Sequence, residues 1–492
     1  MSIIPSFRNS VIPSFRHSVI AAALATVFLL GGGLSAQGPD RSKAPALGPA
    51  PALKLPPIVK RTLSNGLPVW IVEMHKVPLV DVTLIVKTGA SVDPATKQGL
   101  ASVVADMLDE GAGTRSALDI ADGVAFLGGS LRTGSDWDAS TVNLHLPVSK
   151  IDDGLALMSD VALRPTMATG EFDRLRKTRV TSILQGRDNA STLAALAFAK
   201  VLYGPDHRYG ASAAGSEKTL TAMTPVDLKA FHTRYFQPAN AQIIVVGDVT
   251  AASILPKLEK QFGLWKNTAP VAKVSPEPAP PAAPRTIYLV NRPGAAQSQI
   301  RIGLVGVARN TPDYFTLDVV NTILGGSFTS RLNQNLREVH GYAYGASSSF
   351  AMRQGAGPFQ AAAGVQSDKT TESLREFFKE LDAIRQPISE GELTRGKNYQ
   401  ALGFPSSFET ISGMANELVS MAVYNLPDTF FNEYVPKIQA VTSAQALAAA
   451  QKYLQPDKFA IVVVGDLAKI EKGIRDANFG PVKVLTVDEL IK

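Results

Sequence analysis

The sequence predicts an α+β protein made of two homologous blocks, each a mostly antiparallel sheet with helices packed on one face. The main observation is an internal repeat: "YFQPANAQIIVVGD", from Tyr235, returns as "YLQPDKFAIVVVGD" from Tyr453, with eight identities in fourteen positions at an offset of 218 residues. A proline-rich run, residues 267–284, divides the chain between the two copies. Proline removes backbone donors and favours extended conformations, so this run is typical of a linker. A repeat of this length predicts two copies of one structural unit.

Helix signals support the repeat, because each copy follows a segment that begins with threonine. Thr224 opens "TPVDLKAFHTRYF" and Thr442 opens "TSAQALAAAQKYL", again 218 residues apart. Threonine is a favoured N-cap residue, so a helix should precede the repeated strand in both blocks. The shared flanking element makes a chance match of two short segments a poor explanation.

Within each block the predicted order is strand, strand, helix pair, strand, helices, strand. In the first block, β-branched runs predict strands at 66–74 and 80–90, and an alternating run predicts one at 141–148. Residues 171–188 and 191–203 have helical periodicity. A mixed, mainly antiparallel sheet covered by helices on one face accommodates this order.

The N-terminal residues 1–36 have the three-part form of a secretory signal. Arginine-bearing residues precede the apolar stretch Val19–Leu30, and a small-residue segment ends at Ala36, where we expect cleavage. Twelve apolar-type residues are too few to cross a bilayer comfortably, so no membrane span is expected in the mature chain. The Pro/Ala-rich residues 37–57 predict an extended arm. We therefore expect an exported protein, with the periplasm as its compartment.

Composition excludes several classes of function. The 49 lysine and arginine residues exceed the 43 aspartate and glutamate residues by only six in a chain of 492, and no basic cluster is present. This charge gives no electrostatic footprint for nucleic acid. The chain has no cysteine, which excludes thiolate chemistry and disulfides.

One predicted helix, Gln98 to Gly111, has an unusual polar side. Apolar residues recur along one stripe at helical spacing: Leu100, Val103, Val104, Met107 and Leu108. The other side carries Ser102, Ala105 and Asp106. Three positions spaced in this way are those at which a helix can direct two ligands and a base toward one metal ion.

With these segments in view, the chain from about Leu55 resembles the insulinase/pitrilysin family of zinc peptidases, especially two-block members related to the mitochondrial processing peptidase. The resemblance depends on "LSNGLPVWIVEMHKVPLVDVTLIVKTGA", "QGLASVVADML", "FQPANAQIIVVGD" and "LGGSFTSRLNQNLREVHGYAYGASSSF". Active members carry H-x-x-E-H on the helix described above, in which two histidines bind zinc and the glutamate activates water. The resemblance places these three positions at Ser102, Ala105 and Asp106, and the third ligand, a glutamate, near Ser182.

These four positions lack the chemistry of a zinc peptidase. Serine is a poor zinc ligand, alanine cannot act as a base, and Asp106 offers a single carboxylate. The six histidines of the chain never approach i, i+3 or i+4 spacing. The expectation is that this chain holds no zinc and that zinc belongs to a partner subunit.

A second family motif is intact in the C-terminal block. The pattern L-R-x-x-x-G-x-x-Y, in which the resemblance assigns the arginine and the tyrosine to gripping the substrate backbone, places these residues at Arg337 and Tyr344. A guanidinium and a phenol can donate hydrogen bonds to a peptide carbonyl or a developing oxyanion. The alternative is that Arg337 forms an ion pair and the Tyr344 hydroxyl caps a core element.

Three functions follow from these expectations. The first is a non-catalytic, exported subunit that encloses an extended peptide and lends Arg337 and Tyr344 to a zinc-bearing paralogous partner. The second is a free-standing metalloendopeptidase with an altered metal site, and the third is a structural or assembly subunit. Whether this chain is itself an enzyme is left open. The expected organisation is a signal peptide, an arm, a peptidase-like domain with the degenerate motif, a linker and a second peptidase-like domain with the Arg/Tyr motif: 1–36, 37–57, 58–266, 267–284 and 285–488.

Overall fold

The computed structural model describes residues 48, 53–268, 270 and 275–491. The predicted signal segment 1–36 and most of the predicted arm lie outside these residues. The chain divides into two units, 1–49 and 50–492, and the fold described here belongs to the second unit. Within it, residues 53–268 are called the first half and residues 275–491 the second half.

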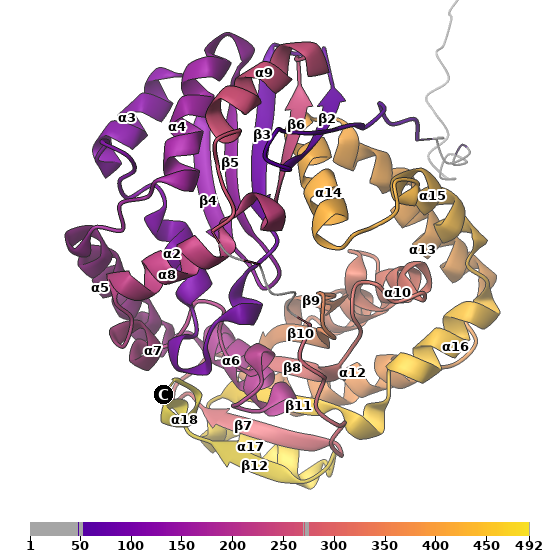
Figure 1. Ribbon diagram of the computed structural model, residues 1–492. Coiled ribbons are helices and arrows are strands. Elements are labelled where there is room, and N and C mark those ends of the chain that lie inside the picture. Colours follow the sequence, from indigo (N-terminus) through magenta and orange to yellow (C-terminus); the bar gives the residue numbers. More distant parts are fainter. Residues whose placement is uncertain (1–47, 49–52, 269, 271–274, 492) are drawn as a thin grey trace, which may run out of the picture. The chain divides into compact units, whose positions relative to one another are not determined.

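Each half contains one six-stranded sheet and a set of helices (Figure 1). The elements of the first half are β1 (Val59–Thr62), β2 (Pro68–Glu73), β3 (Leu79–Val86), α2 (Leu100–Met107), α3 (Ala117–Phe126), β4 (Ser130–Ser135), β5 (Ser140–Pro147), α4 (Ile151–Leu163), α5 (Thr169–Gly186), α6 (Ala190–Tyr203), α7 (Glu217–Thr221), α8 (Pro225–Tyr235), β6 (Ala241–Gly247) and α9 (Ala251–Phe262). The elements of the second half are β7 (Thr286–Asn291), β8 (Gln297–Val305), α10 (Tyr314–Asn321), α11 (Arg331–Asn333), β9 (Ala343–Phe350), β10 (Pro358–Gln366), α12 (Thr370–Ala383), α13 (Glu390–Gly403), α14 (Ile411–Val423), α15 (Phe430–Ala440), α16 (Ser443–Tyr453), β11 (Ala460–Gly465), α17 (Leu467–Asp476), β12 (Val482–Leu485) and α18 (Val487–Ile491).

The two sheets share the same strand order over five of their six strands, which confirms the predicted α+β fold of two homologous blocks. The strand orders are β1-β2-β6-β3-β5-β4 and β12-β7-β11-β8-β10-β9. In each sheet the repeated strand, β6 or β11, pairs parallel with one neighbour and antiparallel with the other. The two copies of the repeat thus lie in equivalent elements, at the end of α8 or α16 and along β6 or β11. The sixth strand differs between the sheets: in the sequence, β1 precedes the other five strands of the first sheet, whereas β12 follows the other five strands of the second sheet.

The central strands are buried on both faces, unlike strands that face water on one side. All seven residues of β6 are buried. Alternate side chains point to opposite faces of a strand, and here they enter different cores: Ile243 and Val245 pack into the core of the first half, while Ile244 and Val246 pack with residues of the second half. A continuous apolar run therefore needs a cover on each side of the sheet.

The second cover comes from the opposite half. Helix α14 packs on β3 and β6, and α6 packs on β8 and β11 (Figure 1). The sequence indicated helices on one face of each sheet, and the structure adds one exchanged helix on the other face. The apolar side chains on both faces of β6 and β11 are the physical reason for this exchange.

Two tyrosines at the C-terminal ends of the exchanged helices join the halves reciprocally. Tyr203 is the last residue of α6, and Tyr424 directly follows α14. The Tyr203 hydroxyl donates to the Ala356 carbonyl at 2.9 Å, in the turn between β9 and β10. The Tyr424 hydroxyl donates to Asp138 Oδ2 at 3.2 Å, in the turn between β4 and β5. Burial raises the pKa of the Asp138 carboxyl. Each half therefore contacts the equivalent hairpin turn of the other.

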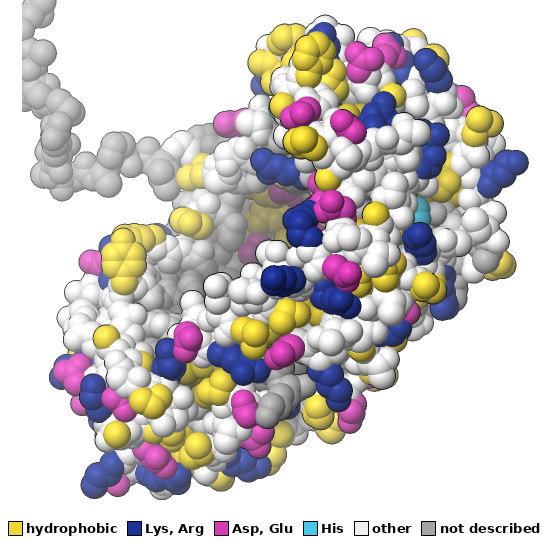
Figure 2. Space-filling view, turned by 90° about the vertical axis from the view of Figure 1, so that its left-hand side faces the viewer, with side chains coloured by type: hydrophobic (Ala, Val, Ile, Leu, Met, Phe, Trp, Pro, Cys, Tyr) yellow, Lys and Arg dark blue, Asp and Glu magenta, His cyan; other side chains and the backbone are white. Residues whose placement is uncertain are grey.

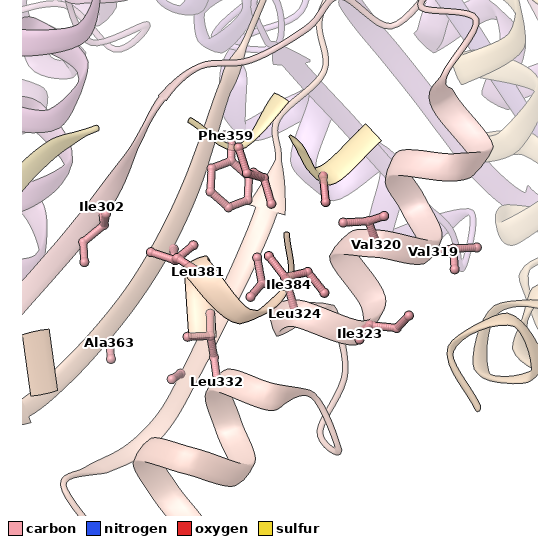
Figure 3. Close-up of a cluster of buried hydrophobic side chains, with 14 of the residues drawn as sticks. Ile302, Val319, Val320, Ile323, Leu324, Leu332, Phe359, Ala363, Leu381 and Ile384 are labelled. Atoms are coloured by element: carbon pink, nitrogen blue, oxygen red, sulfur yellow. The ribbon is translucent and has the colours of Figure 1, made fainter. Parts of the chain in front are cut away.

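The core of the second half supports the segment that carries the Arg/Tyr motif. Figure 3 shows apolar side chains from β8, β10 and the helices α10 to α12 converging between sheet and helices. Leu332 and Leu336, in the turns just before Arg337, are fully buried in this core. Their burial fixes the backbone from which Arg337 projects.

The surface and helices of the described part of the chain give two further observations. On the face drawn in Figure 2, lysine and arginine side chains are interspersed with aspartate and glutamate instead of forming one patch. Among the described residues, no helix combines the length and apolarity required to span a bilayer.

Candidate functional site

Helix α2 is fixed at its N-terminus by a buried carboxylate. Gly99 adopts a left-handed conformation with φ of 93°, which glycine accommodates without strain. The Asp93 carboxylate accepts hydrogen bonds from the backbone N–H groups of Gly99 at 2.8 Å and Ala101 at 3.0 Å. Burial raises the pKa of Asp93 to about 7, although these two hydrogen bonds act in the opposite direction. The start of α2 is thereby held in one register.

The three positions that the sequence analysis assigned to a degenerate zinc motif have different environments on α2. Ala105 is fully buried, whereas Ser102 and Asp106 are half-buried. Ser102 and Asp106 are four residues apart and so lie on one face of the helix. That face is turned toward α5.

Arg179 of α5 connects these two side chains. Its Nη2 donates to Asp106 Oδ2 at 2.6 Å and to Ser102 Oγ at 2.8 Å, and its Nε donates to the same Asp106 oxygen at 3.0 Å. Nη2 also lies 3.2 Å from the Ser102 carbonyl oxygen. The Arg179 side chain is 17% exposed and that of Asp106 is 39% exposed. An ion pair therefore occupies the place where the sequence indicated the remains of a metal site.

Ser182, the residue expected at the third ligand position, does not take part in this cluster. Its side chain is exposed, and its hydroxyl donates to the Thr178 carbonyl at 3.1 Å within α5. Arg179, three residues earlier, was missed by counting from the following loop. The helical register contained the signal: Arg179 lies four residues after Leu175 and four before Ile183, both of which pack on the first core.

The edge of the first sheet lies beside α2. Strand β4 is the last strand in the sheet order and pairs with β5 alone among the strands that the structure describes. Its residues are half-buried or exposed, and α2 packs against it. An edge strand presents unpaired backbone N–H and C=O groups that an extended peptide can join.

Arg337 and Tyr344 lie close together in the second half. Arg337 is in the π-helical turn η7 (Gln334–Val339), and Tyr344 is the second residue of β9. The Arg337 guanidinium carbon is 5.2 Å from the centroid of the Tyr344 ring and 4.6 Å from that of the Phe328 ring. Gly341, with φ of 63°, forms the turn between them.

The exposure of these residues bears on their role. Tyr344 is 87% exposed and Phe328 is 58% exposed, so Tyr344 does not cap a core element. Arg337 Nε lies 3.3 Å from Glu338 Oε1, a neighbouring surface carboxylate. The two motif side chains therefore form a cation–π cluster that remains accessible to a ligand or a partner.

The turn that carries Arg337 is anchored from beneath. Asn335 donates from Nδ2 to Glu376 at 2.8 Å and to Glu380 at 2.6 Å, both on α12. His340 Nε2 lies 3.6 Å from the same Glu376 carboxylate. Within the described ranges, no hydrogen bond or ion pair joins the Arg337 cluster to Ser102, Asp106 or Arg179, so these are two separate groups.

The described residues include no group of three or more His, Asp or Glu side chains able to hold a metal ion. The histidines serve other contacts. His145 Nδ1 lies 3.4 Å from Asp81, His232 Nε2 lies 2.9 Å from the Ala162 carbonyl, and His207 accepts from the Tyr209 N–H. His17 lies outside the described residues.

Comparison with known proteins gives the family. A family model described as "Insulinase (Peptidase family M16)" matches residues 69–196, and one described as "Peptidase M16 inactive domain" matches residues 222–399. Together they cover more than half of the chain. The chain belongs to the insulinase family. This confirms the resemblance found in the sequence.

Relatives of this insulinase-family chain extend over most of its length. It is 26% identical over 418 residues to an uncharacterized zinc protease of Mycobacterium bovis, which covers 84% of this chain and 94% of that protein. A crystal structure described as a peptidase M16 inactive domain from Pseudomonas fluorescens is 26% identical with a TM-score of 0.78, covering 83% of this chain and 98% of that one.

A third relative shows the same fold in a longer chain. The first half of the periplasmic protease PqqL of Escherichia coli matches with a TM-score of 0.68 and 17% identity, covering 88% of this chain and 100% of that structure. The whole PqqL structure matches with a TM-score of 0.70, but only 52% of it is covered. At this identity the likeness establishes the fold alone.

Proposed function

We propose that this chain is a non-catalytic, exported subunit of an insulinase-family peptidase. In this role it binds an extended peptide and lends Arg337 and Tyr344 to the active site of a zinc-bearing paralogous partner. The observation that carries the proposal is the contrast between the two groups of residues. The degenerate motif is closed by an internal ion pair, whereas the Arg/Tyr motif is exposed.

The residues at the motif do not fit zinc. A catalytic zinc requires three protein ligands with His nitrogen or carboxylate oxygen about 2.0–2.2 Å from the metal. Of the three side chains in this cluster, Ser102, Asp106 and Arg179, only Asp106 has a carboxylate. The Asp106 carboxylate and the Ser102 hydroxyl already accept hydrogen bonds from Arg179. Ala105 cannot activate water. We therefore derive no hydrolytic step from this chain.

Peptide binding is supported by the free edge of β4. A peptide that added a strand there would form backbone hydrogen bonds of low sequence specificity, directly beside α2. The second group would act elsewhere: a guanidinium and a phenol close together can donate to a substrate carbonyl or to the oxyanion that develops from it. Among the described residues no hydrogen bond or ion pair joins the two groups, and we assign Arg337 and Tyr344 to the zinc site of the partner.

The architecture of PqqL supports a partner of the same kind. About half of that longer chain lies outside the match with this one, and a second M16 unit is the simplest counterpart for a chain of this length. We place the subunit in the periplasm, in keeping with the signal-like segment 1–36 and with the compartment named for PqqL.

The deciding experiment compares the purified mature chain alone and mixed with a paralogue that carries an intact H-x-x-E-H. We expect no stoichiometric zinc and no peptide cleavage by the chain alone, and cleavage by the pair that depends on Arg337. About one tightly bound zinc per chain, with chelator-sensitive cleavage by the chain alone, would instead establish the metalloendopeptidase with an altered site. Formation of a stable pair whose cleavage is unaffected by this chain would favour the structural or assembly subunit.

A further inference from the structure

The geometry points to a specific replacement for the metal: we propose that the Arg179 guanidinium is a fixed cation that takes the place of zinc between α2 and α5. It would perform the structural part of the metal's role, which is to join two helices through their side chains. This inference goes beyond the proposed function, because it concerns only this chain and needs no partner.

The first argument is the identity of the atoms that Arg179 contacts. In the family, the first and last positions of the motif on α2 hold the metal, and here these positions are Ser102 and Asp106. Arg179 donates to the side-chain oxygens of both, at 2.8 Å and 2.6 Å. The lone pairs that a metal would use are therefore engaged by the guanidinium.

The second argument is the place of Arg179 in the chain. The third metal ligand of the family comes from a later helix, and Arg179 lies on α5, 73 residues after Asp106. It is the α5 side chain that contacts both motif positions, whereas Ser182 contacts neither. From α5, Arg179 therefore makes the contact that a third ligand would make, with a positive charge in place of the negative charge of a glutamate.

The third argument is charge. Arginine stays protonated in proteins, so its charge at this position is permanent. A divalent cation placed between Ser102 and Asp106 would be repelled by a guanidinium only a few ångströms away. The positive charge of Arg179 would therefore disfavour metal binding even if metal ligands were restored on α2.

An ordinary surface ion pair would have a different geometry. Arg174, on the same helix, pairs with Glu110 and Glu171, but its side chain is 56% exposed. Arg179 is 17% exposed and uses two nitrogens on one carboxylate oxygen. Its remaining nitrogen, Nη1, is buried without a hydrogen-bond partner among the described residues.

The test restores the motif on α2 and varies only α5. The background is the variant with Ser102→His, Ala105→Glu and Asp106→His, to which Arg179→Glu, Arg179→Gln or Ser182→Glu is added. Zinc affinity is measured by competition with a chromophoric chelator, and circular dichroism confirms folding. We expect the background to bind zinc at least 10-fold more weakly than the Arg179→Glu variant, with about one zinc per chain in the latter.

Two comparisons make the result decisive. Arg179→Gln removes the charge without adding a ligand and should also bind at least 10-fold more tightly than the background, so it keeps the test valid if the glutamate variant does not fold. Ser182→Glu, which retains Arg179, should match the background. Equal affinity of the background and both Arg179 variants, including no binding by any, would overturn the inference, as would tighter binding by the Ser182→Glu variant. Neither outcome depends on whether a partner subunit exists.

Discussion

Replacing Arg179 with methionine should weaken the joint between α2 and α5 by an amount that can be predicted from its contacts. The side chain donates two hydrogen bonds to the Asp106 carboxylate, one to the Ser102 hydroxyl and a longer one to the Ser102 carbonyl. Exposed ion pairs contribute about 0.2–1 kcal/mol, and breaking fully buried ones costs about 3–5 kcal/mol. Because Arg179 is 17% exposed and Asp106 is 39% exposed, we expect a coupling free energy of about 1–2 kcal/mol between these limits.

The assay is a double-mutant cycle in urea. The free energy of unfolding is measured for the mature chain, for Arg179→Met, for Asp106→Asn and for the combination, and the cycle isolates the pairwise part of the loss. The matched control is the same cycle on Arg174 and Glu110, which join α5 to the residues just after α2; the Arg174 side chain is 56% exposed and that of Glu110 is 20% exposed. We expect that control to give less coupling, about 0.2–1 kcal/mol, because its arginine is mostly in solvent and loses little hydration in the pair.

Two results would refute this reasoning. If the Arg179 cycle gives no more coupling than the Arg174 cycle, the guanidinium is not a structural link between the helices. If Arg179→Lys retains the full coupling, a point charge is sufficient and the two-nitrogen geometry has no importance. Lysine has one nitrogen and cannot reproduce that geometry.

The remaining predictions concern the motif, the junction of the halves and pH. In an assembled pair, Arg337→Ala or Tyr344→Ala should leave folding intact and lower peptide cleavage about a hundredfold or more, as for loss of an oxyanion donor; an effect within twofold would show that the motif serves packing. Tyr424→Phe should lower the free energy of unfolding by about 1 kcal/mol through loss of one hydrogen bond, and urea unfolding that matches the unmutated chain would contradict this. Burial raises the pKa of Asp93 to about 7, so the folded chain retains a proton that the unfolded chain releases near pH 4. The free energy of unfolding should therefore fall as pH rises from about 4 to 7, and Asp93→Asn should lack this contribution to the slope.

The repeated fold could be predicted from the sequence because its signals are local. The strand and helix patterns of the first half, and the recurrence of the segments at Tyr235 and Tyr453, need no knowledge of tertiary structure. The predicted helix 171–188 corresponds to α5, and the predicted helix 191–203 to α6. The exchange of α6 and α14 was not predicted. The apolar residues of a helix show that one of its faces is buried, but they do not identify the sheet against which that face packs.

The candidate site was predictable in part for a similar reason. Arg337 and Tyr344 were found through a contiguous motif, and the structure brings them within 5.2 Å. Phe328, which completes their cluster, lies outside that motif. Arg179 was missed because counting along a chain locates a residue only to within about one helical turn. Which side chain of α5 contacts Ser102 and Asp106 depends on the register of α5 against α2, and sequence counting does not give that register.

The junction of the halves indicates where a peptide can be enclosed. Opening the chain between its halves would expose four large apolar side chains of the first half that are buried in the core of the second half: Val72, Ile85, Ile244 and Val246. At about 1.5–3 kcal/mol for each buried side chain, this would cost roughly 6–12 kcal/mol, similar to the whole stability of a typical domain. The reciprocal helix α6 and the two tyrosine hydrogen bonds add to that cost. The joint within the chain is therefore too strong to serve as a hinge. We expect closure over a peptide to occur between this chain and a second M16 unit, to which the exposed Arg337 and Tyr344 would then be accessible.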